Sequence, residues 1–209
     1  DLTSRASFSI TDIRRFVFDR LNTGGTKLNA QELRNAIYPG AFNKAIIELA
    51  RNPTFTTIFG IPAYVETDPN DYYENPRRQR NNLYRTMGDC QLVLRYFALR
   101  DQSNIRGSMQ AMLDRAMESR MGLHDSDVEP LKTEYLSRLE VAANIFGPKP
   151  FLLPPDERGN RRLSAALYDA SLVAIHRLWS RHESFLTRAA GISGRLLAQF
   201  SSPDAAAIL

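Results

Sequence analysis

Phe18-Asp19-Arg20-Leu21-Asn22-Thr23-Gly24-Gly25-Thr26-Lys27-Leu28-Asn29-Ala30-Gln31-Glu32-Leu33-Arg34 holds the end of one predicted helix, a glycine turn and the start of a second helix. Ser9 and Asp12 have capping-box spacing before an apolar stripe at helical intervals, which predicts the first helix. The two glycines end it, because glycine permits the positive φ of a helix terminus. Asn29 and Glu32 repeat the capping-box spacing and predict the second helix. This part of the chain is therefore expected to be a helix-loop-helix.

The glycine turn lies beside a helix start, where backbone amides and the helix dipole favour an anion. Its candidate phosphate-binding groups are Arg20, Asn22, Thr23, and the amides of Gly24 and Gly25. An ordinary capped turn between two helices explains the same spacing, and short glycine motifs occur often without a ligand. From spacing alone the ordinary turn is the preferred interpretation.

The same stretch also has a family resemblance. With Glu32-Leu33-Arg34-Asn35-Ala36 following the glycines, it resembles the Phe-x-Arg-x-Asn-x-Gly-Gly-x-x-Leu…Glu-Leu-Arg signature of the GmrSD-type family, a ParB-like domain of unknown function. Leu92 to Leu99 resembles the family's Leu-x-Leu-Arg-Phe-Phe-Ala helix. Asn144 to Phe151 resembles its later Phe-Gly…Phe segment. The resemblance covers most of the chain up to about Ala170, and the first motif is by far the most specific.

The resemblance implies a nucleotide-dependent DNA-restriction or defence protein, since several family members restrict modified or foreign DNA. It implies a phosphate site with Mg²⁺ and a nucleoside triphosphate as cofactors and an upstream ParB-like segment as partner. On this view Asp19 and Glu32 help to hold the Mg²⁺-nucleotide. The implied nucleotide- or phosphate-binding residues are Arg20, Asn22, Thr23, Gly24, Gly25, Glu32 and Arg34.

Three features of the family pattern are missing from this sequence. The hallmark Asp-Gly-Gln-Gln-Arg motif does not occur, nor does the Phe-Gln-Arg-x-Tyr-x-Trp type of segment that normally precedes it. No C-terminal His-Asn-His nuclease domain is visible. The first residue is Asp1 rather than Met, which fits an excised or processed fragment. We therefore expect this chain to be the later part of such a protein, beginning within or just after its ParB-like domain. By itself it is expected to be inactive.

The periodicity of the remaining sequence is helical, and no strand-rich stretch or internal repeat occurs. We predict an all-α bundle of about seven to nine helices, whose N-terminal helix-loop-helix would complete the upstream ParB-like domain. Residues 1–60 are assigned to that domain and 77–209 to a helical domain, with a proline-rich linker between them. Beyond the second helix, helices are predicted around residues 42–49, 77–100 with a break at 87–89, 105–121, 127–146, 163–178 and 185–200. Arg95 would lie inside one of them and would need a carboxylate or carbonyl partner.

The 209-residue chain has a modest basic bias, with a formal net charge of +4 and a pI near 9.4. Arginine outnumbers lysine 23 to 4, which favours bidentate phosphate contacts. The candidate nucleic-acid-binding residues are Arg77, Arg78, Arg80, Arg158, Arg161 and Arg162. Charge clusters are more often solvated faces, and genomic base composition also explains an arginine excess.

Sequence motifs for other chemistry are absent. His176 and His182 are six residues apart and do not form the i, i+4 pair of a helical metal site, so no zinc site is expected. For this chain alone, without the upstream segment, no metal or other cofactor is expected. Cys90 is interpreted as a small buried hydrophobe. No apolar run is long enough to cross a membrane, and a cytoplasmic location is expected. The alternative function is a non-catalytic helical scaffold for protein or DNA binding. The sequence leaves open whether the chain forms a homo-oligomer.

Overall fold

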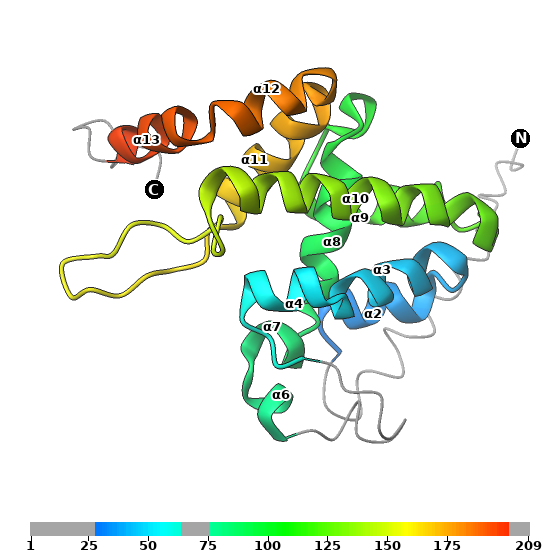
Figure 1. Ribbon diagram of the computed structural model, residues 1–209. Helices are drawn as coiled ribbons and strands as arrows, with labels where there is room; N and C mark the ends of the chain where they lie inside the picture. Colours follow the sequence, from blue (N-terminus) through cyan, green and yellow to red (C-terminus); the bar gives the residue numbers. More distant parts are fainter. Residues whose placement is uncertain (1–27, 64–75, 201–209) are drawn as a thin grey trace, which may run out of the picture.

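The computed structural model describes residues 28–63 and 76–200 (Figure 1). Helices make up 72% of these residues, and apart from one bridge between Leu152 and Leu163 no strand pairing occurs among them. The all-α prediction is confirmed. Eleven α-helices are present in the described ranges, more than the seven to nine predicted, because several predicted helices are divided.

The α-helices are α2 (Ala30–Ile37), α3 (Ala41–Arg51), α4 (Pro53–Phe59), α6 (Pro76–Arg80), α7 (Asn82–Arg85), α8 (Gly88–Leu99), α9 (Met109–Glu118), α10 (Asp125–Phe146), α11 (Ala165–Arg177), α12 (His182–Thr187) and α13 (Ala189–Phe200). Two short 3-10 helices, η1 (Gln102–Asn104) and η2 (Trp179–Arg181), connect some of them.

The start of α2 confirms the predicted capping box. The Asn29 side chain accepts hydrogen bonds from the backbone N–H groups of Gln31 and Glu32, at 2.9 and 3.0 Å. The Glu32 carboxylate accepts from the Asn29 N–H at 2.6 Å. These bonds satisfy amides that have no partner inside the helix, so the local sequence is sufficient to set this boundary.

The segment after α3 contains a helix that the periodicity did not predict. Asn52-Pro53 ends α3, and the Asn52 side chain also accepts from the Thr54 N–H at 2.9 Å. Proline is well suited to the first helical position, because its missing N–H needs no partner there. Asn52-Pro53 therefore ends one helix and begins α4, which stops at Gly60 in the left-handed conformation.

The predicted helix over 77–100 is divided into α6, α7 and α8. The expected break at 87–89 is confirmed, since Met87 has a φ of 52°. A second break occurs where Asn81 caps α7 by accepting from the Tyr84 N–H. Arg95 has the carboxylate partner that the sequence required, because its Nε donates to Asp169 on α11 at 2.9 Å.

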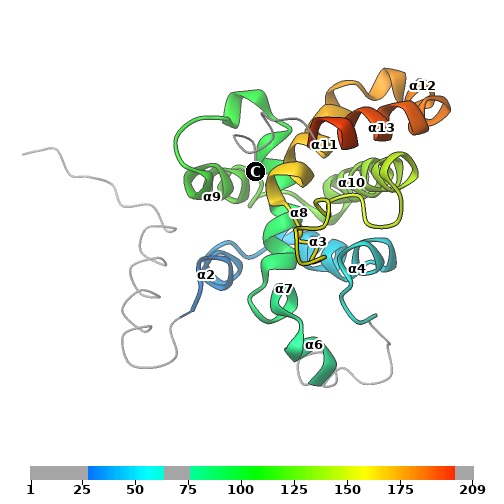
Figure 2. The same cartoon turned by 90° about the vertical axis from the view of Figure 1, so that its left-hand side faces the viewer.

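Helix α8 runs through the middle of the molecule (Figure 2) and α10 crosses it (Figure 1). Helices α3 and α4 pack on α10, and so do α11, α12 and α13. The Phe42 ring of α3 meets the Phe97 ring of α8 edge-on, with centroids 5.3 Å apart. The described parts of the two predicted domains thus share one hydrophobic core. The predicted first helix lies outside the described residues, so completion of an upstream domain stays a prediction.

Some predicted helix boundaries in the second half are wrong. Helix α9 begins at Met109 rather than near Ile105, because Gly107 has a φ of 74° and Ser108 caps the helix. Leu178, the last residue of the helix predicted over 163–178, lies just beyond the end of α11 and is 45% exposed. The last predicted helix is two helices divided at Arg188.

None of the helices in the described ranges combines the length and the apolar character that a membrane crossing requires.

Candidate functional site

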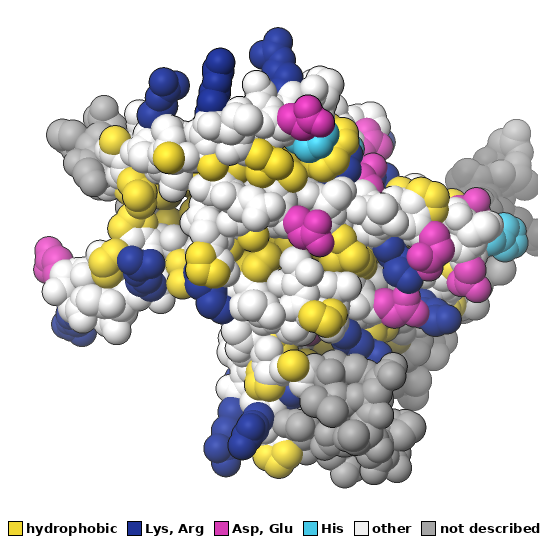
Figure 3. Space-filling view, viewed as in Figure 1, with side chains coloured by type: hydrophobic (Ala, Val, Ile, Leu, Met, Phe, Trp, Pro, Cys, Tyr) yellow, Lys and Arg dark blue, Asp and Glu magenta, His cyan; other side chains and the backbone are white. Residues whose placement is uncertain are grey.

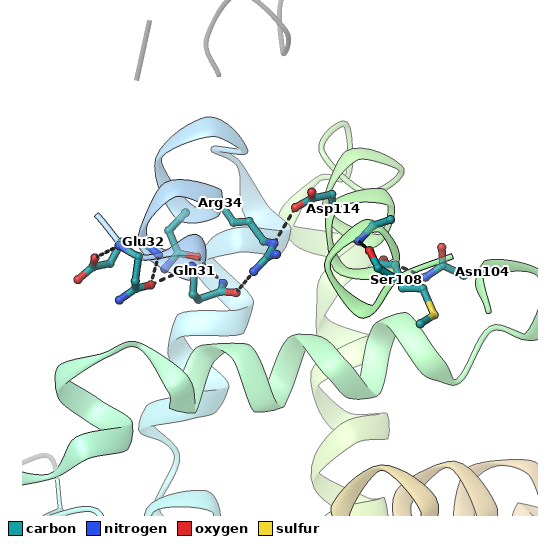
Figure 4. Close-up of polar contacts among 10 residues, drawn as sticks. Gln31, Glu32, Arg34, Asn104, Ser108 and Asp114 are labelled. Carbon is teal, nitrogen blue, oxygen red and sulfur yellow. Dashed lines mark hydrogen bonds and ion pairs between the residues drawn. The ribbon is translucent and has the colours of Figure 1, made fainter. Parts of the chain in front are cut away.

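The predicted phosphate-binding residues are only partly visible in the structure. Arg20, Asn22, Thr23, Gly24 and Gly25 lie outside the described residues. Glu32 and Arg34 lie on different sides of α2 (Figure 4).

Arg34 contacts α9 rather than an open site. Its side chain is 4% exposed, and its Nε donates to the Asp114 carboxylate at 2.7 Å (Figure 4). Its Nη1 donates to Gln31 Oε1 at 3.2 Å. These contacts join α2 to α9 through a buried ion pair. A structural role for Arg34 follows directly from them.

Glu32 faces a cavity of about 380 Å³ formed by the starts of α2 and α8 together with α6 and α7. The two helix starts are tied together, since Asn29 Nδ2 donates to the Thr86 carbonyl at 3.0 Å and Asn35 Nδ2 contacts Met87 Sδ at 3.3 Å. The cavity is lined by Leu28, Glu32, Gln79, Tyr84, Arg85, Met87, Asp89 and Cys90.

Asp89 is the most unusual group in this cavity wall. It is 5% exposed, and burial raises the pKa of its carboxyl from 3.8 to about 6, against the opposing effects of the Cys90 N–H and Arg51. A carboxyl group with a strongly raised pKa beside a cavity is typical of a functional site, because selection for stability alone disfavours it. Sequence reasoning missed Asp89. The sequence did contain one indication that Asp89 is buried: it is next to Cys90, at the start of the most buried helix.

Cys90 is buried, as predicted, at 4% exposure. Burial, with the neighbouring Asp89 carboxylate, raises the pKa of its thiol well above the usual value. The thiolate is the reactive form of cysteine, so Cys90 is an inert part of the wall.

The wall combines two carboxyl groups with one guanidinium. Asp89 and Glu32 supply oxygen donors, and Arg85 lies at the end of α7, where its Nη2 donates to Asn82 Oδ1 at 3.0 Å. The starts of α2 and α8 add the positive ends of two helix dipoles. This set of groups suits a cation bound together with an anion.

The arginines predicted to bind nucleic acid differ in exposure. Arg77 and Arg80 are exposed on α6, whereas Arg78 is 2% exposed and donates to the carbonyls of Pro62 and Ala63, at 3.3 and 2.7 Å. Arg78 thus fastens α6 to the segment after α4. Arg158, Arg161 and Arg162 are all exposed in the long loop between α10 and α11 (Figure 1).

A polar cluster that the sequence did not predict joins α8, α10 and α11. Tyr96 Oη donates to Glu134 Oε1 at 2.6 Å and lies 3.1 Å from His176 Nδ1, and Arg100 pairs with the same carboxylate. Burial raises the pKa of Tyr96 well above its usual range and lowers that of His176. Because these groups hydrogen-bond one another, the cluster holds the three helices in register.

Within residues 28–63 and 76–200, no three His, Cys, Asp or Glu side chains gather as a metal site would require. No family model, curated protein or solved structure matches the chain.

Proposed function

We propose that this chain is the C-terminal helical part of a GmrSD-type, nucleotide-dependent DNA-restriction or defence protein, and that the cavity beside α2 forms one wall of its Mg²⁺-nucleotide site. The supporting observation is the buried Asp89 carboxyl in the same cavity wall as Glu32. Leu28, which also lines the cavity, comes three residues after Gly25 in the sequence. The predicted phosphate-binding turn is therefore close in sequence to a residue of this wall.

The residues in the wall fit the implied cofactors. Mg²⁺ prefers oxygen ligands and usually takes one or two carboxylates together with phosphate oxygens. Glu32 and Asp89 would hold the metal, and Arg85 would contact a phosphate group. A cation beside Asp89 would also favour its ionised form and so offset the effect of burial on its pKa. When bound, the Mg²⁺ would neutralise phosphate charge for nucleotide hydrolysis or for nucleotide-driven coupling to a nuclease.

In this role the upstream ParB-like segment supplies the other half of the site, and the protein acts in the cytoplasm. The exposed arginines of α6 and of the loop between α10 and α11 would contact DNA. Arg34 would act through its pair with Asp114, by fixing α2 and hence Glu32.

Calorimetric titration tests the proposal, with Mg²⁺ and ATP, GTP or CTP added to this chain and to a longer form that includes the upstream segment. We expect binding only to the longer form, because its phosphate site is divided between two segments. In the longer form, Glu32→Gln should weaken binding at least about tenfold, by the loss of a metal ligand. Glutamine retains the capping box of α2, so this variant keeps the helix start.

The matched control is Glu118→Gln, an exposed carboxylate of α9 away from the cavity. It should bind the nucleotide as the unchanged protein does. In the full-length protein Asn22→Ala should abolish the response to nucleotide. The proposal would be overturned if neither form bound any of the three nucleotides. It would also be overturned if Glu32→Gln and Asn22→Ala both left nucleotide binding and the nucleotide response unchanged.

The alternative function, a non-catalytic scaffold for DNA or protein, is favoured by a different observation. Arg34 and Arg78, two of the predicted ligand-binding arginines, are buried and bonded within the protein. If no nucleotide binds, but DNA binding falls steeply with salt, this alternative would hold.

A further inference from the structure

Three exposed arginines follow one another at seven-residue intervals through η2, α12 and α13. They are Arg181, Arg188 and Arg195, here called the arginine row. Arg181 lies in η2, Arg188 lies at the break between α12 and α13, and Arg195 lies in α13, so helical periodicity alone does not bring them together. In the space-filling view, Lys and Arg side chains project next to one another from the edge formed by α12 and α13 (Figure 3). The surface view therefore shows a basic edge over α12 and α13.

The charges of the row are not neutralised by the described part of the chain. No carboxylate of residues 28–63 or 76–200 forms an ion pair with them, whereas Arg34, Arg95 and Arg100 each have one. Between residues 177 and 200 the sequence contains four arginines and a single acidic residue, Glu183. This edge is thus a positive surface whose guanidinium groups face solvent.

The arrangement of apolar side chains argues against a membrane surface as the partner. Leu186 and Leu197 are 38% and 56% exposed, and each lies two residues from an arginine of the row. Within α13, Arg195 and Leu197 are two residues apart, which is about 200° of rotation, so this arginine and this leucine face opposite directions. One flat lipid surface could not contact both sets, although membrane-binding helices need their apolar side in the lipid.

The aromatic side chains argue against single-stranded nucleic acid. Binding of unpaired bases usually needs exposed aromatic rings on which the bases stack. The single tryptophan of the sequence, Trp179, is already stacked on the His182 ring, with ring centroids 4.2 Å apart, and Arg138 lies 3.6 Å from the Trp179 ring centroid. A partner with a regular array of phosphates and no need for stacking fits this edge better.

We propose that the arginine row binds the phosphate backbone of duplex DNA without reading its sequence. Guanidinium groups bind phosphate oxygens in a bidentate way, and backbone contacts of this kind position a protein on DNA. Between Arg188 and Arg195 an apolar recess of about 520 Å³, with Phe185 and Ile192 in its wall, leaves space for the sugar between adjacent phosphates. The inference depends on this edge alone and is separate from the nucleotide site.

The test is binding of a short fluorescent DNA duplex, without nucleotide, to this chain and to Arg181→Gln/Arg188→Gln/Arg195→Gln, over a range of salt concentrations. Each lost phosphate contact should reduce the slope of log K against log salt by about 0.9, so we expect a reduction of about 2 to 3. At about 0.1 M salt the affinity should fall at least about tenfold. All three positions are exposed, and a thermal melt would show that the fold is retained.

The matched control removes the same charge elsewhere, at three exposed positions, as Lys44→Gln/Arg106→Gln/Lys149→Gln. It should change the affinity less than about threefold and leave the salt slope nearly unchanged. An equal loss in both variants, or unchanged DNA binding in the first, would overturn the proposal. The proposal would also be overturned if the arginine-row variant bound the duplex as the unchanged chain does and lost binding only to vesicles of anionic lipid.

Discussion

Replacing Arg34 by methionine is expected to lower the free energy of unfolding by about 3 kcal/mol. The guanidinium is almost completely buried, and the variant takes it away from the Asp114 carboxylate, whose side chain is only 18% exposed. Removing one member of a buried ion pair is costly, because water that would solvate the remaining charge is largely excluded. Urea unfolding followed by circular dichroism measures the change.

A double variant separates this loss from the loss of side-chain volume. Arg34→Met/Asp114→Leu removes both charges of the pair, and most of the lost stability should return, because the carboxylate that Arg34 had balanced is removed as well. If Arg34→Met instead keeps full stability while the longer form loses nucleotide binding, Arg34 is a ligand-binding residue and the ion pair is incidental.

Replacing Asp89 by asparagine is expected to raise the free energy of unfolding at pH 7 by about 2 to 3 kcal/mol. The native carboxyl has a pKa of about 6, against 3.8 as the ordinary value. Between pH 3.8 and about pH 6, the Asp89 carboxyl is already deprotonated in the unfolded state but still protonated in the native state. Raising the pH through this range therefore favours unfolding. The contribution of Asp89 to the free energy of unfolding is therefore fully present below pH 4, decreases as the pH rises to about 6, and stays low above it.

Unfolding measured from pH 4 to pH 8 checks this sign. The unchanged chain and Asp89→Asn should differ little at pH 4 and most at pH 7. In the longer form the same variant should weaken Mg²⁺-nucleotide binding, which would make Asp89 a residue kept for function against stability. Lower stability of Asp89→Asn at pH 7 would contradict the assignment, since it would mean that the ionised carboxylate stabilises the fold.

The sequence was most informative where structure depends on near neighbours. Asn29 and Glu32 cap α2 through bonds that span three residues, and Gly147 ends α10, so both boundaries were predictable. At Asn52-Pro53 the same local chemistry was visible, but the ending of one helix hid the beginning of the next. Local bonds set these boundaries without help from the rest of the fold.

Burial of charged groups depends on distant parts of the chain and could not be predicted in the same way. Arg78 and Arg80 belong to one cluster in the sequence, yet Arg78 is buried and Arg80 is exposed. Arg34 pairs with Asp114, 80 residues away, and Asp89 is buried because α2 and α8 meet at their starts. Composition and spacing do not contain these contacts, so the candidate cavity became visible only in the fold.

Helices α12 and α13 contain no fully buried side chain, whereas α8 contains eight. Segments with few buried contacts open locally at a free energy well below that of global unfolding. The amide hydrogens of α12 and α13 should therefore exchange with deuterium while those of α8 remain protected. Since the arginine row borders these two helices, from Arg181 in η2 to Arg195 in α13, a bound duplex would slow exchange there first and leave the central helix unchanged.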